Sequence, residues 1–221
     1  MRTIFYLAIA ALLFTACSSA SPRETMQRDV DQATAIIERF QSIPEQGIPA
    51  TVLRNARGLA ILTVTKAGFI GSGRAGSGVV IARLGSGGWS GPSAIGTGGL
   101  GVGFQAGVQI TEFVIVLNTP AAVDAFSRGG NVTLGGALSV AAGPIGRSAE
   151  GNVALQAAMF SYSRSQGLFA GVSLEGTVIT TRDDLNRDFY GSTSVTATDI
   201  LSGRVRPPAG AQRLIAAVTK Y

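Results

Sequence analysis

The sequence predicts an α+β fold, in which a strongly curled, mainly antiparallel β-sheet or barrel-like core carries helices at its N- and C-terminal ends. Segments with strand character fill the middle of the chain and helical periodicity is confined to both ends, a segregation typical of this class. Most links between successive strands are too short for crossover helices, which favours antiparallel pairing. The 30 glycines concentrate between residues 58 and 176 and indicate tight coiling of the sheet.

Residues 1–16 predict a signal peptide. One arginine precedes the apolar run Thr3–Phe14, which is too short to span a bilayer as a helix and is typical of a secretory signal. The sequence around Cys17 resembles a bacterial lipobox, although Phe14 stands where leucine is usual. We therefore expect a lipoprotein with palmitate or a similar acyl chain on Cys17. The alternative is a soluble secreted protein with a cysteine at the cleavage site.

Residues 17–35 are expected to form the lipidated N-terminus and the start of the first helix, and residues 36–221 the folded domain. Ser21 and Glu24 have the spacing of a capping box around Pro22, which suits a first helical turn. Apolar residues then recur at alternating intervals of four and three, which predicts a core-facing helical stripe ending before Pro44. The stripe consists of Met26, Val30, Ala33, Ile37 and Phe40.

The central region begins with a short helix over 48–56, ended by Gly58. Strands are expected at 59–66 and 78–84, because these segments are rich in Ile, Val and Thr or other apolar residues. The glycine-rich stretch between them reads as a flexible cationic loop containing Arg74. Glycine at nearly every second position of 96–103 would strip one face of a further strand of its side chains and allow close packing.

The remaining elements follow from alternation and capping signals. They are a strand at 110–117, a short helix from Thr119 to Gly129, strands at 132–140 and 154–163, a hairpin of 168–174 with 177–181, a polar loop or short helix at 182–190, and helices at 198–202 and 209–219.

The sequence offers little for catalysis. Histidine is absent, which removes the commonest general base and a common metal ligand. Cys17 belongs to the lipobox, and Thr63 and Lys66 would point to opposite faces of a strand. Glu112, Glu150 and Glu175 are isolated in sequence. We therefore expect no enzyme and no catalytic residues.

Two motifs that resemble ligand-binding sites lie in a sequence context that does not suit the ligand. Each G-x-G-x-x-G match, at 71–76 and at 96–101, runs into a strand, whereas a dinucleotide site needs a helix there. The segment from Asp184 opens like a calcium loop, but Phe189 and Val195 replace the required Gly and Glu. No cofactor and no metal are expected.

The charge pattern leaves an anion site as the main chemical signal. The formal net charge is +5, and 16 of the 18 cations are arginine, whose planar fork grips phosphates. Glycine-rich loops can add backbone N–H donors. The candidate anion- or lipid-binding residues, all near expected strand ends or turns, are Lys66, Arg74, Arg83, Arg128 and Arg147. The alternative is that each lies at the surface only because charges usually do.

Ordered motifs lie at 65–69, 72–80, 89–95, 130–136, 143–147 and 161–163 with 167–171. This series resembles the SYLF domain, also called the yeast actin-patch-type actin-binding domain, and the resemblance covers about residue 36 to the C-terminus. It implies a lipid-binding module, with phosphoinositide ligands in eukaryotic members, actin binding in the yeast ones and lipoproteins among bacterial members. It implies no catalytic residues.

Together these observations predict a membrane-anchored periplasmic lipid-binding module that recognises anionic headgroups through cationic glycine-rich loops. The alternative is an envelope structural or protein-interaction lipoprotein without a lipid ligand. The expected partners are a phospholipid membrane and an envelope protein, with no nucleic acid. Ser18 after the lipidated cysteine favours the periplasmic face of the outer membrane as the location.

Overall fold

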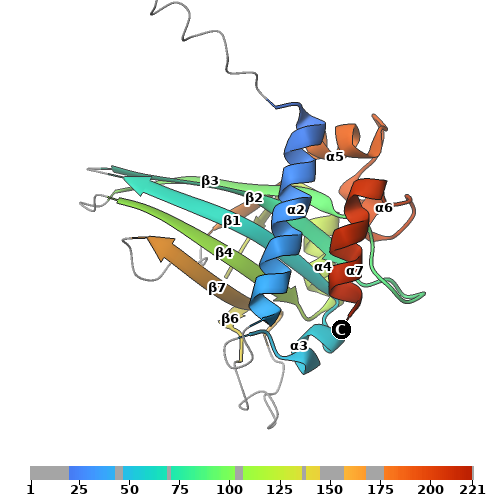
Figure 1. Cartoon of the computed structure of the whole chain (residues 1–221), viewed down its shortest axis with the longest axis horizontal. Coiled ribbons are helices and arrows are strands. Elements are labelled where there is room, and N and C mark those ends of the chain that lie inside the picture. Colours follow the sequence, from blue (N-terminus) through green and yellow to red (C-terminus); the bar gives the residue numbers. More distant parts are fainter. Residues whose placement is uncertain are drawn as a thin grey trace, which may run out of the picture.

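The structure, a computed structural model, describes residues 20–42, 47–68, 71–102, 107–135, 138–144, 157–167 and 177–220. Its centre is a curled eight-stranded sheet with the strand order β5-β8-β3-β2-β1-β4-β7-β6 (Figure 1). The pairing is antiparallel except between β6 and β7, which confirms the expected fold class. The strands are β1 (Gly58–Gly68), β2 (Gly71–Ala82), β3 (Ser93–Val102), β4 (Gly107–Leu117), β5 (Asn131–Thr133), β6 (Val140–Ala142), β7 (Met159–Gly167) and β8 (Val178–Thr181).

Helices stand at the two ends of the chain, with one between strands. The capping box at Ser21 is present in both directions, since its hydroxyl accepts from the Glu24 N–H and its own N–H donates to the Glu24 carboxylate. The segment at 182–190, read as a loop or short helix, is helical. The elements are α2 (Pro22–Gln41), α3 (Ala50–Asn55), α4 (Pro120–Ser127), α5 (Asp183–Tyr190), α6 (Ala197–Leu201), the 3-10 helix η2 (Ala209–Ala211) and α7 (Gln212–Thr219).

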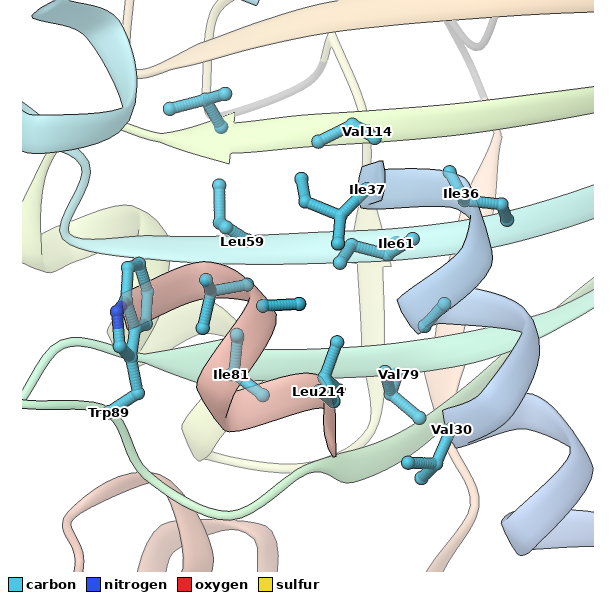
Figure 2. Packing of buried hydrophobic residues seen from close by; sticks show 14 of the residues in the cluster. Val30, Ile36, Ile37, Leu59, Ile61, Val79, Ile81, Trp89, Val114 and Leu214 are labelled. Atoms are coloured by element: carbon cyan, nitrogen blue, oxygen red, sulfur yellow. The ribbon is translucent and has the colours of Figure 1, made fainter. Parts of the chain in front are cut away.

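One face of the sheet, here called the α2 face, packs against α2, α5 and α7. The stripe of α2 is buried in this layer, which confirms that it faces the core. Figure 2 shows how side chains of β1, β2 and β4 interdigitate with α2 and with Leu214 of α7. Each fully buried aliphatic side chain stabilises the fold by about 1.5–3 kcal/mol.

The opposite face, here called the α4 face, carries a second apolar cluster against α4 and α6. Ala60 and Leu62 of β1 point to this side, whereas Leu59 and Ile61 belong to the α2 face. Because both faces are covered here, the start of β1 is an unbroken apolar run without alternation.

The two ends of the central strands differ. At the end where β1 begins and β4 finishes, here called the helix end, the side chains are buried on both faces. At the end where β1 leads to β2 and β3 to β4, here called the hairpin end, exposed side chains alternate with half-buried ones on β1 and with buried ones on β4. Figure 1 shows these strands continuing past α2 on that side. At the hairpin end, the exposed side chains of β1, β2 and β4 therefore lie on the α2 face, whereas on the α4 face Lys66 and Arg74 are half-buried and Gln109 is buried.

The glycine-rich loop predicted around Arg74 is wrong, because Gly71 to Gly78 form the first two thirds of β2. None of these glycines has a positive φ. Gly76 and Gly78 are needed for close approach of two strands, not for a turn. A Cβ on Gly78 would lie 2.1 Å from the carbonyl oxygen of Ile61, and one on Gly76 would lie 2.8 Å from that of Thr63.

The single strand predicted at 132–140 is also wrong. Its two halves are β5 and β6, which lie at opposite edges of the sheet. Gly135, with φ of +77°, departs from extended geometry between them, and alternation alone cannot reveal such a break. The strand predicted at 154–163 begins instead at Met159 and continues to Gly167. The hairpin segment 168–174 lies outside the described residues.

Two predictions about the chain's organisation can be placed on this fold without being decided by it. The boundary expected at residue 36 falls inside α2, whose Met26 and Val30 are buried in the core. Cys17 lies outside the described residues. Within the ranges that are described, no helix has both the length and the apolarity to cross a bilayer.

Candidate functional site

Three polar side chains lie side by side on the α4 face at the hairpin end. Arg74 of β2 is the Cα partner of Lys66 of β1, and Lys66 is in turn the partner of Gln109 of β4. Directly opposed residues of antiparallel strands share a face, with Cβ atoms about 4.5–5.5 Å apart. We call these three residues the cationic row.

The members of the row offer complementary chemistry. Arg74 provides a planar bidentate fork and Lys66 a compact positive charge, and both are half-buried. Gln109 is only 1% exposed, yet neither its amide nitrogen nor its amide oxygen has a hydrogen-bond partner among the described residues. Leaving a buried amide without hydrogen bonds is costly, so any group that pairs with the Gln109 amide would stabilise this position.

Glycine lets Arg74 lie against the sheet. Gly99 of β3 is the Cα partner of Arg74, and a Cβ there would come within 2.9 Å of the Arg74 Nε. The expectation that glycines of β3 allow close packing is therefore met at Gly99. The neighbouring Gly96 and Gly98 have only ordinary contacts, at 3.5 and 3.9 Å.

None of the described strands places an acidic side chain on the α4 face of the sheet. Glu112 is the only carboxylate in the sequences of the eight described strands, and it belongs to the α2 face. There its two oxygens accept from the Nε and Nη2 of Arg39 in α2. The expected isolation of Glu112 is thus a property of the sequence alone. Its partner is separated from it by 73 residues.

Arg83 lies at the opposite end of the sheet from the cationic row. Its guanidinium donates to the carbonyl oxygens of Ala56 and Leu53, at 3.0 and 3.1 Å, and so satisfies the last turn of α3. It also lies 4.3 Å from the ring centre of Trp89. Burial, followed by the nearby Arg57, lowers the pKa of Arg83. These contacts give Arg83 a structural role at the helix end.

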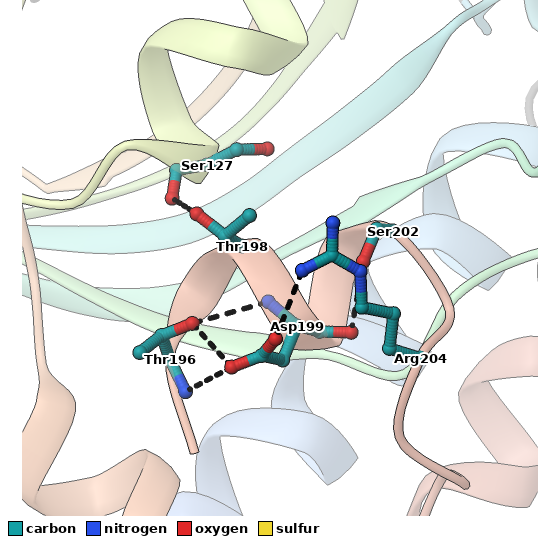
Figure 3. Close-up of polar contacts among 6 residues, drawn as sticks. All are labelled: Ser127, Thr196, Thr198, Asp199, Ser202 and Arg204. Carbon is teal, nitrogen blue, oxygen red and sulfur yellow. Dashed lines mark hydrogen bonds and ion pairs between the residues drawn. The ribbon is translucent and has the colours of Figure 1, made fainter. Parts of the chain in front are cut away.

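Arg128 lies at a third place, in a surface hollow of about 420 Å³ that Arg187 and Asp183 also line. Beside this hollow, the hydroxyl of Thr198 donates to the carbonyl oxygen of Ser127 at 2.7 Å and ties α6 to α4 (Figure 3). Arg147 lies outside the described residues. The structure thus brings Lys66 and Arg74 together and separates Arg83 and Arg128 from them.

A second polar cluster lies between α2 and the sheet. Asp29 accepts a hydrogen bond of 2.8 Å from the hydroxyl of Ser77, beside a cavity of about 30 Å³. The other oxygen of Asp29 and the hydroxyl of Thr63 have no partner in the described chain. Burial raises the pKa of Asp29, although the Ser77 hydrogen bond opposes this. The cavity has room for one water molecule.

The sequence interpretation missed Gln109 and Arg39. The signal for Gln109 was available, because Val108 and Ile110 alternate with Gln109 and Thr111 at the start of β4. No sequence signal could have paired Arg39 with Glu112. In the described ranges, no group of three acidic, Cys or His side chains could hold a metal ion. Both G-x-G-x-x-G matches lie within strands β2 and β3.

Comparison with known proteins adds a family. Residues 98–221 match Ysc84, described as a Las17-binding protein actin regulator. The SH3 domain-containing protein PJ696.02 of Schizosaccharomyces pombe is 54% identical over 186 residues, which cover 82% of this chain and 43% of the relative. The human SH3 domain-containing YSC84-like protein 1 is 50% identical over 196 residues, covering 86% of this chain and 57% of the relative.

A yeast relative extends the picture. LAS seventeen-binding protein 3 of Saccharomyces cerevisiae is 56% identical over 168 residues, which cover 74% of this chain and 36% of the relative. This chain therefore spans about half or less of the length of these relatives. Their names describe binding and SH3-containing proteins, and none of these three names describes an enzyme.

Proposed function

The chain belongs to the Ysc84 family, the SYLF family that its motifs indicate, and from this premise we propose a membrane-anchored lipid-binding module that recognises anionic headgroups through the cationic row. The lipid anchor at Cys17 and the periplasmic face of the outer membrane are parts of the same proposal.

The observation that carries this proposal is the register of three neighbouring strands. It sets Arg74, Lys66 and Gln109 beside one another on a face to which none of the described strands contributes a carboxylate. A phosphate bound there accepts from the guanidinium and the ammonium, and the Gln109 amide donates a third hydrogen bond. The Gln109 carbonyl oxygen is left to accept from a headgroup hydroxyl or ammonium. A phosphodiester with such a neighbour fits all three side chains.

The test is co-sedimentation of the full chain, carrying Cys17→Ser, with phosphatidylglycerol-containing vesicles and with pure phosphatidylcholine vesicles. Arg74→Ala is expected to weaken binding to the anionic vesicles by about 1.5–3 kcal/mol, the scale of a hydrogen bond to a charged group. The difference should shrink at high salt, because screening weakens the interaction already.

Arg54→Ala is the matched control. Arg54 is another exposed cation, but it lies in α3 at the helix end. It removes the same charge from a different surface and is expected to change anionic binding far less. Equal losses in the two variants, or no preference of the parent chain for anionic vesicles, would refute the headgroup site.

A second candidate function is protein binding in the envelope without a lipid ligand. It is favoured by the names of the family and its yeast relative, which describe binding to Las17. Crosslinking in intact cells followed by purification would support it if one stoichiometric protein partner is recovered and no lipid co-purifies. Loss of that crosslink in Arg74→Ala would assign the cationic row to the protein partner.

A further inference from the structure

The hairpin end carries an apolar surface on the face opposite the cationic row. Val108 and Ile110 of β4 are 55% and 45% exposed, the two largest values among the large hydrophobic side chains described. Both belong to the α2 face, because they alternate with Gln109 and are in phase with the buried Val114. Such exposure of two neighbouring aliphatic side chains is informative.

The neighbours of these two residues extend the surface across the sheet. Ala67 is the Cα partner of Val108, and Thr65 is the partner of both Ile110 and Ala75. All three neighbours are exposed, and none carries a charge. We call Val108, Ile110, Ala67, Thr65 and Ala75 the apolar patch.

The helical layer stops short of this patch. α2 crosses the sheet where Asp29 contacts Ser77 and Arg39 contacts Glu112. The patch begins one residue pair farther toward the hairpin end on the same face, with Thr65, Ala75 and Ile110. The patch is therefore exposed because α2 crosses the sheet before reaching it. Beyond α2, toward the helix end, the same strands are buried.

We propose that the apolar patch inserts into the interfacial and acyl region of an anionic bilayer while the cationic row, on the reverse of the same strands, engages headgroups. This rests on the proposed function and deepens it, since it specifies how the domain meets the membrane. The positive charges of Lys66 and Arg74 favour an anionic bilayer as the surface that covers the apolar patch. Binding at a membrane interface combines buried apolar area with attraction to anionic lipids. The hairpin end provides both, because the apolar patch and the cationic row lie on opposite faces of the same strands.

The first experiment measures insertion directly, using the full chain with Cys17→Ser and tryptophan quenching by lipids brominated on their acyl chains. Trp89 is the only tryptophan and is buried, so the parent chain supplies the background. Ile110→Trp is expected to be quenched in anionic vesicles. Ser86→Trp, in the exposed turn at the helix end, is the matched probe and is expected to stay at background.

The second experiment removes apolarity without disturbing the strand. Val108→Thr with Ile110→Thr keeps β-branching and should lower partitioning into phosphatidylglycerol vesicles by about ten- to a hundredfold. The exchange variant, Val108→Ile with Ile110→Val, keeps the apolar surface and should bind like the parent. Thermal melting of both variants checks that the sheet is intact.

The outcomes separate the two proposals. If the parent binds anionic vesicles, but the double threonine variant binds equally well and Ile110→Trp stays unquenched, insertion is refuted and the headgroup site stands. If the parent binds no vesicles, the proposed function fails and insertion fails with it. If the double threonine variant changes only the oligomeric state, the patch is a contact between copies of this chain and insertion is refuted.

Discussion

The helix end and the hairpin end of the central sheet are built from the same four strands but meet different surroundings. At the helix end, helices cover both faces and residues such as Leu59 and Ala60 are buried on either side. At the hairpin end the two faces diverge into the cationic row and the apolar patch. The comparison shows that one pair of β-hairpins can form a packed core at one end and carry exposed and half-buried side chains at the other.

The largest expected effect is on stability, and it distinguishes a glycine of β2 toward the helix end from one at the hairpin end. Gly78→Ala would place a Cβ against backbone atoms of Ile61 and Leu62, which cannot move without breaking the β1–β2 pairing. We expect a loss of about 3 kcal/mol or more in the free energy of unfolding. Gly73→Ala, at the hairpin end, has nothing within 4 Å of the added Cβ and should be nearly neutral. Denaturant unfolding of both variants measures this, and equal losses would contradict the packing difference.

Two arginines that look alike in sequence give the next test. Arg83→Ala removes the donors to Ala56 and Leu53 and the contact with Trp89. We expect it to lower the free energy of unfolding by about 1–3 kcal/mol, because partly buried carbonyl groups lose their partners. Arg74→Ala should change it by less than about 0.5 kcal/mol, as surface substitutions usually do.

Vesicle binding completes this second comparison. Arg83→Ala should leave anionic vesicle binding unchanged at a temperature where it is folded, whereas Arg74→Ala should weaken it. The assignment would be reversed if Arg74→Ala lowered the melting temperature and left vesicle binding intact. Arg74 would then be a residue that rigidifies the sheet.

The smallest effect concerns pH and the α2 layer near the middle of the sheet. Burial raises the pKa of Asp29 in the folded chain, so the native state holds this proton more tightly than the unfolded chain, whose aspartate has a pKa of about 3.9. The stability contributed by protonated Asp29 is present below that value and is lost as pH rises through the raised native pKa.

Asp29→Asn removes this titration while its side-chain oxygen still accepts from Ser77. Its melting temperature relative to the parent should therefore increase between pH 4 and pH 7. Other carboxyl groups with lowered pKa values, such as Asp184 and Asp199, titrate in both chains and cancel in the difference. Parallel melting curves for the two chains across this range would show that Asp29 does not titrate as inferred.

Local patterns in the sequence determined much of the fold. The capping box at Ser21, the stripe of α2, the cap of α4 and the strong strand ending at Leu117 all follow from spacing along a single segment. The α+β class followed in the same way, because helical and strand periods are segregated along the chain. The family was also readable from its ordered motifs, since motifs keep their order whatever the tertiary structure.

Only the tertiary structure decided the role of the glycines and the groups that each cationic side chain contacts. In the sequence, a glycine that forms a turn looks the same as a glycine that lets two strands approach closely. The role of Gly78 is decided by the short distance from its position to the carbonyl oxygen of Ile61. Lys66 and Arg74 lie side by side because of the strand register. Arg83 instead donates to the last turn of α3, because that helix ends beside it. Register, crossing position and helix placement are relations between distant segments, so the sequence could name these candidates but could not group them.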